Sequence, residues 1–476
     1  MEFPTIKFAY FALLVLTVSW ALKQNRTIQK VFLLGASYFF AWKFKPEFLA
    51  VLVLSSLANW YLGKTLVRLK GNTRQKPVLV FGILLNLGVL GFFKYYGFFI
   101  DNLGSFLTWL DLEVHLPILE VIAPFGISFF TFQSMSYLVD TYWDKAVQPA
   151  SILDYLLFIA FFPQYGAGPI CSSRDLLPQL AAPAPKHIPD LSQAVGMIAT
   201  GLLKKMVFAT YLASHLTTDA FLSPQNFTTA ELVLAVYAYT AQVYLDFSGY
   251  TDIARGVSLL FGFKIPENFN YPYRATDIGD FWRRWHMTFS RWLRFYIYFP
   301  LGGSKCSRAR CYFNLMVTFV ACGIWHGPTW GFVIWGTLHG VALTAYKAAL
   351  DLRRDLGIKS EGPYPWWWLA LGCFSTVSFC AFARVFFKAS DLTTAMDYYS
   401  GLIAGTIYGE HFDLGVLFVT LLTFFLNFYG RPFFDAFVDW HEKLPHVARP
   451  FAWAGILALL FTLKPFGMAA TIYFNF

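Results

Sequence analysis

The stretch VLVFGILLNLGVLGFFKYYGFFI, residues 78–100, contains a single charged residue, Lys94. A helix needs about 20 predominantly apolar residues to cross a bilayer, so this stretch predicts a membrane span. Similar apolar blocks run over 8–22, 31–62, 116–142, 153–170, 191–221, 229–248, 312–325, 331–350, 366–388, 413–429 and 450–475. The blocks predict an all-α polytopic membrane protein with about eleven transmembrane helices and short interfacial or re-entrant helices.

The composition supports a membrane protein. Of the 476 residues, 57% are apolar and 14% are charged, whereas a soluble globular chain carries about 25% charged residues. This excludes a soluble enzyme, a disordered chain and a nucleic-acid-binding module. The net charge of +9 fits Lys and Arg in cytoplasmic loops. We expect one membrane-embedded domain over 1–476, with its motifs at about 120–345. Lys43, Lys45, Pro46 and Glu47 interrupt the 31–62 block, which predicts two short helices or a broken one.

The segment FWRRWHMTFSRWLRFYIYF, residues 281–299, has Trp and Arg at helical spacing. At 100° per residue, one face carries Trp282, Trp285 and Trp292. The opposite face carries Arg283, Arg284, Arg291 and Arg294, and no Asp or Glu occurs from 281 to 350. The pattern predicts a helix within 280–299 at the membrane interface. Its arginines, which we expect to form one basic face without an acidic residue in the helix, could bind lipid headgroups. They could equally attract a phosphate-bearing acyl donor to the cytoplasmic side.

Two histidines lie in the apolar segment GIWHGPTWGFVIWGTLHG, residues 323–340. Ionisable groups at membrane depth usually face a protein interior or a water-filled cavity. Pro328 lacks a backbone donor and should end or kink a helix beside His326. An exposed imidazole at such a break could act as a general base. The alternative is a structural histidine bonded to a backbone carbonyl, and this alternative is stronger for His339, which lies in smoother helical sequence.

Polar residues precede these segments in DFSGYTDIARGVSLLFGFKIPENFNYPY, residues 246–273. Asp252 and Arg255 are three residues apart and can neutralise one another on a helix. Asn268 and Asn270 lie in a predicted ordered loop, which either lines a cavity or packs against the next helix. The sequence contains no G-x-S-x-G, P-loop or H-E-x-x-H motif, so any chemistry must rest on histidine. Its six cysteines lack zinc-like or CxxC spacing, and we expect neither a disulfide nor a metal site.

Read in order, these motifs closely resemble the membrane-bound O-acyltransferase family. The similarity is to the bacterial branch with the alginate O-acetylation membrane protein and the peptidoglycan O-acetyltransferase membrane subunit. PFGISFFTFQSMSYLVDTYW at 124–143 and FFPQYGAGPI at 161–170 also resemble that branch. The resemblance covers roughly 30–345, and the last 130 residues carry no recognisable motif.

The resemblance implies a helical membrane fold in which a funnel and a tunnel meet near mid-membrane. It implies that His326, in the WHG motif, is catalytic and that His286, in the RWH motif, is a second catalytic histidine. His339 would support them, and the arginines of 281–299 would bind the donor. The donor would be acetyl-CoA or another acyl thioester, with no permanently bound cofactor. The acceptor would be a polysaccharide or a periplasmic esterase-like partner protein.

The leading hypothesis is therefore an O-acyltransferase of the bacterial inner membrane. It would move an acyl group toward hydroxyls of a cell-envelope polysaccharide such as peptidoglycan or alginate, and acetyl is the favoured acyl group. One alternative is a D-alanyl transferase for teichoic acid, whose family members share the RWH and WHG elements. An alternative of another class is a transporter of a glycan precursor, although the chain shows no repeat or symmetric pair of broken helices of the kind many transporters carry.

Overall fold

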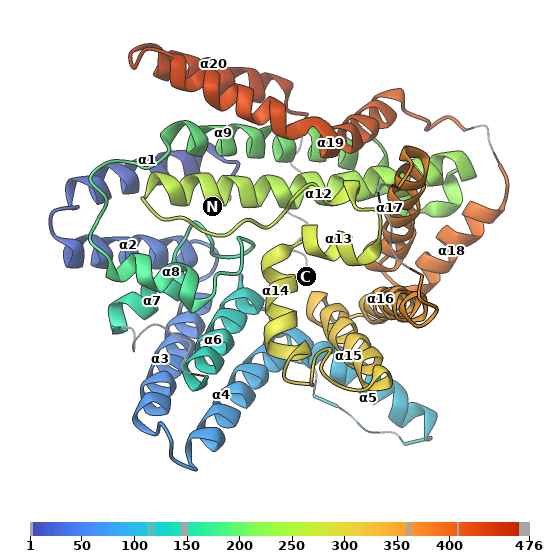
Figure 1. Cartoon of the computed structure of the whole chain (residues 1–476), viewed down its shortest axis with the longest axis horizontal. Coiled ribbons are helices and arrows are strands. Elements are labelled where there is room, and N and C mark those ends of the chain that lie inside the picture. The colour runs from blue at the N-terminus through green and yellow to red at the C-terminus, as the bar shows by residue number, and fades with distance from the viewer. Residues whose placement is uncertain are drawn as a thin grey trace. The chain divides into compact units, whose positions relative to one another are not determined.

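The computed structural model describes residues 3–465 except 113, 115, 118, 144–150, 359–361, 363, 407 and 408. Every regular element in these residues is a helix (Figure 1). The chain divides into two compact units. The first unit comprises Met1–Ala194 and Ala254–Pro266, and the second comprises Val195–Ile253 and Glu267–Phe476. The single domain expected over the whole chain stays a prediction.

The first unit begins with antiparallel apolar helices and ends with short buried ones. Its helices are α1 (Ile6–Ala21), α2 (Arg26–Trp42), α3 (Pro46–Arg68), α4 (Gln75–Leu90), α5 (Tyr96–Trp109), α6 (Ile127–Tyr142), α7 (Ile152–Ala160) and α8 (Ser173–Ala181). A π-helical turn, Gly91–Tyr95, joins α4 to α5. The 31–62 block is divided as expected, because α2 ends at Trp42 and Pro46 occupies the first turn of α3.

The core of the first unit is built around α6, which packs against α3 and α4. Almost every residue of α6 is buried. Close approach requires glycine, since a Cβ on Gly63 would lie 2.3 Å from the Tyr137 ring, and one on Gly82 would lie 2.7 Å from Leu138. The 124–143 and 161–170 motifs meet here, where the Tyr165 hydroxyl donates to the Phe125 carbonyl at 2.8 Å.

Buried charges in the first unit are paired. Asp140 is fully buried and accepts hydrogen bonds from Arg174 Nη2 at 2.9 Å and Ser173 Oγ at 3.2 Å. Lys30 Nζ lies 2.6 Å from Asp154 Oδ1. Pairing matters because a buried charge without a partner is strongly destabilising.

The second unit contains longer helices from the remainder of the chain. They are α9 (Leu191–Leu202), α10 (Thr210–Leu212), α11 (Thr218–Leu222), α12 (Thr229–Leu260), α13 (Ile278–Arg284), α14 (Met287–Leu293), α15 (Arg308–His326), α16 (Trp330–Asp355), α17 (Trp366–Lys388), α18 (Leu392–Ile403), α19 (Leu414–Lys443) and α20 (Ala448–Leu463). The first residues of α9 and the last of α12 belong to the first unit. π-Helical turns at Leu203–Ala209 and Ala213–Thr217 join α9, α10 and α11.

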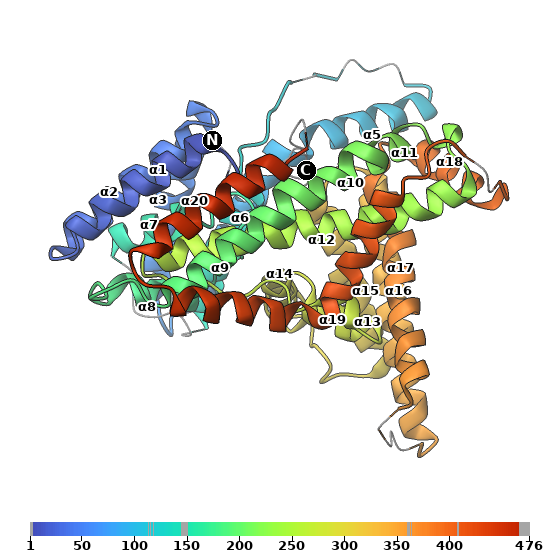
Figure 2. The same ribbon diagram turned by 90° about the horizontal axis from the view of Figure 1, so that it is seen from above.

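Helices α15 and α16 form a tight hairpin, and α16 packs in turn on α17 (Figure 2). A Cβ on Gly323 would lie 2.2 Å from the Phe332 carbonyl oxygen, and one on Gly336 would lie 2.4 Å from that of Phe319. A Cβ on Gly331 would likewise lie 2.3 Å from the Phe386 carbonyl oxygen of α17. Glycine therefore lets three backbones approach one another closely.

Five helical stretches of the described residues are long and apolar enough to span a membrane: Pro46–Arg68, Gln75–Trp109, Leu191–Leu222, Trp366–Lys388 and Leu414–Lys443. The expected count of about eleven is not confirmed. Some apolar blocks are buried in protein instead. The 116–142 block yields the 16-residue α6, and the 153–170 block yields the nine-residue α7 followed by buried turns.

Candidate active site

Three histidines of the second unit are gathered in one aromatic cluster. His286, His326 and His339 are all buried, with exposed fractions of 1%, 4% and 1%. They come from the α13–α14 junction, the end of α15 and the middle of α16. In the described part of the chain, no three His, Cys, Asp or Glu side chains are placed to hold a metal ion. The three buried histidines bring imidazole nitrogens into aromatic surroundings.

His326 is the last residue of α15. Gly327 is extended, and α16 begins only at Trp330, so the helix breaks beside this histidine as the proline and glycine predicted. The imidazole is nevertheless buried and not exposed. Aromatic rings of Trp335 and Phe387 lie 5.0 Å from it, centroid to centroid, and that of Phe289 lies 5.9 Å away. Three separate helices thus enclose it.

His339 lies behind His326 in the cluster. The Trp335 ring joins the two histidines, since its centroid lies 4.7 Å from that of His339. Trp282 Nε1 donates to His339 Nδ1 at 3.3 Å. That hydrogen bond places the imidazole proton on Nε2 of the neutral ring. His339 is therefore held by the side chain of Trp282. A structural histidine had been expected to bond to a backbone carbonyl.

His286 sits at the start of α14 with φ +43°, in the left-handed region. Residues other than glycine are uncommon there, and such strain concentrates at functional sites. Its Nδ1 donates to Asn268 Oδ1 at 3.1 Å, which leaves Nε2 as the basic nitrogen. The His286 ring lies 4.9 Å from that of Phe289, and the Phe289 ring stacks at 4.2 Å on Trp325, the neighbour of His326.

The polar loop before α13 packs against the α13–α14 junction, which is one of the two expected roles. Asn268 Oδ1 accepts hydrogen bonds from Thr288 N at 3.2 Å and Thr288 Oγ1 at 2.8 Å, and its carbonyl accepts from Met287 N at 2.9 Å. Asn270 N donates to the Arg284 carbonyl at 3.0 Å. The loop therefore holds the strained backbone of His286 in place.

The segment 280–299 is not one helix, which corrects the predicted single basic face. It forms α13, a break at Trp285–His286, α14 and a π-helical turn, Arg294–Tyr298. Constant 100° spacing does not extend across the break. Trp282, Trp285 and Trp292 are all buried, and each packs against another aromatic ring of the protein.

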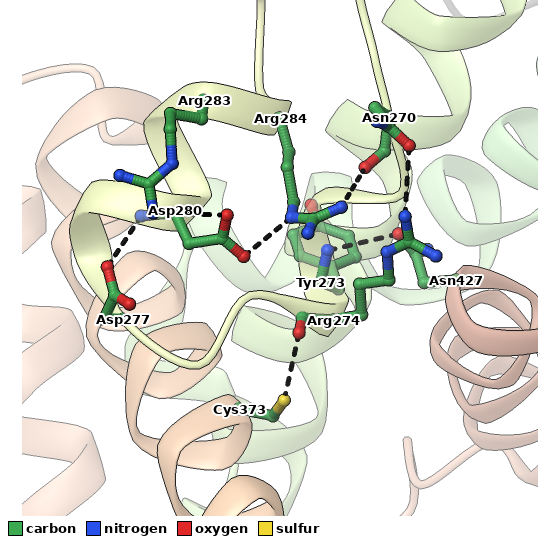
Figure 3. Close-up of polar contacts among 9 residues, drawn as sticks. All are labelled: Asn270, Tyr273, Arg274, Asp277, Asp280, Arg283, Arg284, Cys373 and Asn427. Atoms are coloured by element: carbon green, nitrogen blue, oxygen red, sulfur yellow. Dashed lines mark hydrogen bonds and ion pairs between the residues drawn. The ribbon is translucent and has the colours of Figure 1, made fainter. Parts of the chain in front are cut away.

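The expectation that no acid lies in the arginine helix is also wrong. Helix α13 begins at Ile278, so Asp280 belongs to it. Arg284 Nε lies 2.7 Å from Asp280 Oδ2, and Arg283 Nη2 lies 3.4 Å from Oδ1 (Figure 3). Arg291 lies on α14 and is half-buried, and Arg294 begins the following π turn and is exposed. The four arginines therefore separate into a pair bound to Asp280 and two residues further along.

The sequence did not predict the environments of three charged residues of the second unit. Asp252 forms an ion pair with Lys204 at 2.7 Å, and Asp246 forms one with Lys205. The third is Arg384 on α17, which is buried with a 5% exposed fraction. A lone arginine within the apolar block 366–388 was the available signal, since an ionisable residue in a membrane segment is a candidate functional residue.

Comparison with known proteins gives a consistent result. The model of the membrane-bound O-acyltransferase family matches residues 46–386. The peptidoglycan O-acetyltransferase of Helicobacter pylori is 34% identical over 80% of this chain and 75% of its own. The probable alginate O-acetylase AlgI of Pseudomonas syringae pv. tomato is 33% identical over 87% of this chain and 76% of its own. The teichoic acid D-alanyltransferase of Bacillus subtilis is 30% identical over 52% and 65%.

Proposed function

Because this chain belongs to the membrane-bound O-acyltransferase family and is an O-acyltransferase, we propose that it transfers acetyl groups toward a cell-envelope polysaccharide. The donor is acetyl-CoA or another acyl thioester on the cytoplasmic side of the inner membrane. The acceptor is a hydroxyl of a glycan such as peptidoglycan or alginate, reached directly or through a periplasmic partner protein. Acetyl is favoured over D-alanyl because the relatives named for O-acetylation match the larger share of the chain.

The observation that carries this proposal is the burial of His326 at a helix break, inside rings from α14, α16 and α17. Its imidazole takes the proton of the acceptor hydroxyl as that oxygen attacks the thioester carbonyl. A thioester is already activated, so orientation, a base and the exclusion of water suffice.

The other two histidines have positioning roles in this proposal. His286 presents Nε2 because Asn268 fixes Nδ1, and it orients the donor or the acceptor. His339 is held by Trp282 and supports the Trp335 ring against which His326 rests. Arg283, Arg284, Arg291 and Arg294 attract the donor's phosphates, and the exposed Arg294 is the most accessible to them.

Transfer by the purified protein tests the proposal. Wild type and His326→Ala are incubated with radiolabelled acetyl-CoA and a soluble peptidoglycan fragment, and label in the fragment and in acetate is counted. We expect wild type to transfer or hydrolyse and His326→Ala to do neither. His187→Ala, which removes an exposed histidine of the first unit, serves as the matched control and should behave as wild type. Near-normal activity of both His326→Ala and His339→Ala would refute the proposal.

A further inference from the structure

Arg384 is a buried cation with an unusual environment. Its guanidinium carbon lies 4.8 Å from the centroid of the Trp285 ring and 5.9 Å from that of Phe281. Among the described residues no carboxylate forms an ion pair with it, and its Nη1 has no hydrogen-bond partner. Asp246, a buried acid of the same unit, is already paired with Lys205. Burying a charge in this way is destabilising unless a ligand meets it.

The position of Arg384 in helix α17 brings it to the histidine cluster. Phe387 lies three residues further along, on the same helix face, where side chains are about 5–6 Å apart. The Phe387 ring lies 5.0 Å from that of His326 and 5.2 Å from that of Trp335. The residue under the guanidinium, Trp285, directly precedes His286.

The two aromatic rings that contact Arg384 are also connected to His339. The rings of Phe281 and Trp285 stack at 5.6 Å, and Trp282 between them in sequence donates its indole proton to His339. The guanidinium therefore borders the same cluster as the three imidazoles. It is held there by the faces of two rings and by a hydrogen bond with the Tyr273 side chain, while its Nη1 keeps an unused donor.

We propose that Arg384 is a catalytic residue that binds the acyl carbonyl oxygen and stabilises the negative charge that forms on it. This inference rests on the proposed acyltransfer. A cation fixed in a dry site and directed at developing charge is worth much more than the same group in water. A resident carboxylate would neutralise the guanidinium, whereas aromatic rings hold it and keep it charged.

In the proposed acyl transfer, each bond that forms replaces a bond that breaks. The acceptor hydroxyl oxygen forms a bond to the thioester carbonyl carbon, its proton passes to His326, and the carbonyl π electrons move onto oxygen beside Arg384. The oxyanion then re-forms the C=O bond, the C–S bond breaks, and the thiolate takes the proton back from His326. The products are an ester and a free thiol.

The kinetic experiment compares Arg384→Met with Lys388→Met, which removes an exposed cation one turn further along α17. Rates of acetyl transfer from radiolabelled acetyl-CoA to a soluble peptidoglycan fragment are measured against both substrates. We expect Arg384→Met to lower kcat by about 10²–10³-fold with both KM values unchanged, as for loss of an oxyanion donor. Arg384→Lys should recover part of the rate, and Lys388→Met should match wild type.

Binding and stability measurements separate this role from a structural one. In a His326→Ala background, we expect Arg384→Gln to leave acetyl-CoA binding and the unfolding temperature unchanged. A fall confined to abundance or unfolding temperature, or a higher KM with unchanged kcat, overturns the inference. If His326→Ala is inactive while Arg384→Met stays within threefold of wild type, this inference alone fails. If both His326→Ala and His339→Ala transfer acetyl normally, the proposed function fails.

Discussion

The core of the first unit and the histidine cluster of the second differ in how they surround buried polar groups. In the first unit, Asp140 is fully buried and satisfied by Arg174 and Ser173. In the second unit, Arg384 and three histidines are buried largely among aromatic rings. Ion pairing of the first kind holds a fold together, whereas ionisable groups packed among aromatic rings are candidates for a functional role. Mutations in the two regions should therefore affect different quantities.

The largest effect is expected for the catalytic base. His326→Ala should lower kcat by about 10²–10⁴-fold, the usual contribution of general-base catalysis. The unfolding temperature in detergent should change far less than kcat, because the rings of Phe289, Trp335 and Phe387 still pack around the position. Activity and thermal unfolding are measured on the same preparation. If kcat and the unfolding temperature fell together, His326 would have a structural role like that of the paired residues of the first unit.

The paired region should show the converse behaviour. Asp140→Ala removes the fully buried carboxylate that Arg174 and Ser173 bind. Because the Arg174 side chain is 44% exposed and can be solvated, the loss of stability should stay below the about 3–5 kcal/mol of a fully buried pair. We expect lower abundance and a lower unfolding temperature, with kcat per folded molecule unchanged. The double variant Asp140→Ala/Arg174→Ala should recover part of the loss. A change in kcat at equal folded fraction would mean that the first unit takes part in the chemistry.

The glycine hairpin should respond in both quantities at once. Gly336→Ala places a Cβ 2.4 Å from a backbone oxygen of α15, so the helices must separate at a cost of about 1–3 kcal/mol. The move also shifts His339 relative to His326, and kcat should fall with stability. Gly455→Ala, on α20 with nothing within 4 Å of the added Cβ, is the control and should not reduce either. Thermal unfolding and acetyl transfer report the outcome.

The smallest effect concerns the arginines. Arg294→Glu should raise the donor KM several-fold, since each charge near an anionic ligand contributes about 1 kcal/mol. Arg284→Glu should raise it less, because Asp280 already neutralises part of the charge of Arg284. KM values at low and high salt distinguish the two variants. If abundance alone fell, the arginines would serve as membrane anchors.

Sequence reasoning recovered local features better than long-range ones. The break beside His326 and the division at Pro46 follow from proline chemistry within a few residues, and both are present. The predicted basic face is wrong because His286 adopts a left-handed conformation, which is fixed by hydrogen bonds that His286 and Thr288 donate to Asn268 and that periodicity does not reveal. Apolar content alone does not fix the number of spans, since burial in protein and burial in lipid leave the same composition, and the count of about eleven stays a prediction.

Arg384 illustrates the same limit for the site. Nothing near it in sequence resembles a motif, and its meaning comes from Trp285 and Phe281, about a hundred residues earlier. The three histidines were found because two recognisable motifs carry them. Their ring-to-ring arrangement depends on tertiary packing. Their assigned roles stay predictions until the variants are measured.

The glycine contact between α15 and α16 bears on how acyl-group preference could evolve. With Gly323 and Gly336 backbone to backbone, the hairpin that carries His326 and His339 has no side chains there that could be enlarged or trimmed to resize the space between them. Room for a longer acyl chain has to come from outside the hairpin. Phe289 on α14 and Phe387 on α17 border His326 and can be shortened without moving a backbone. Divergence toward other acyl groups should therefore accumulate on α14 and α17 while the hairpin glycines stay fixed.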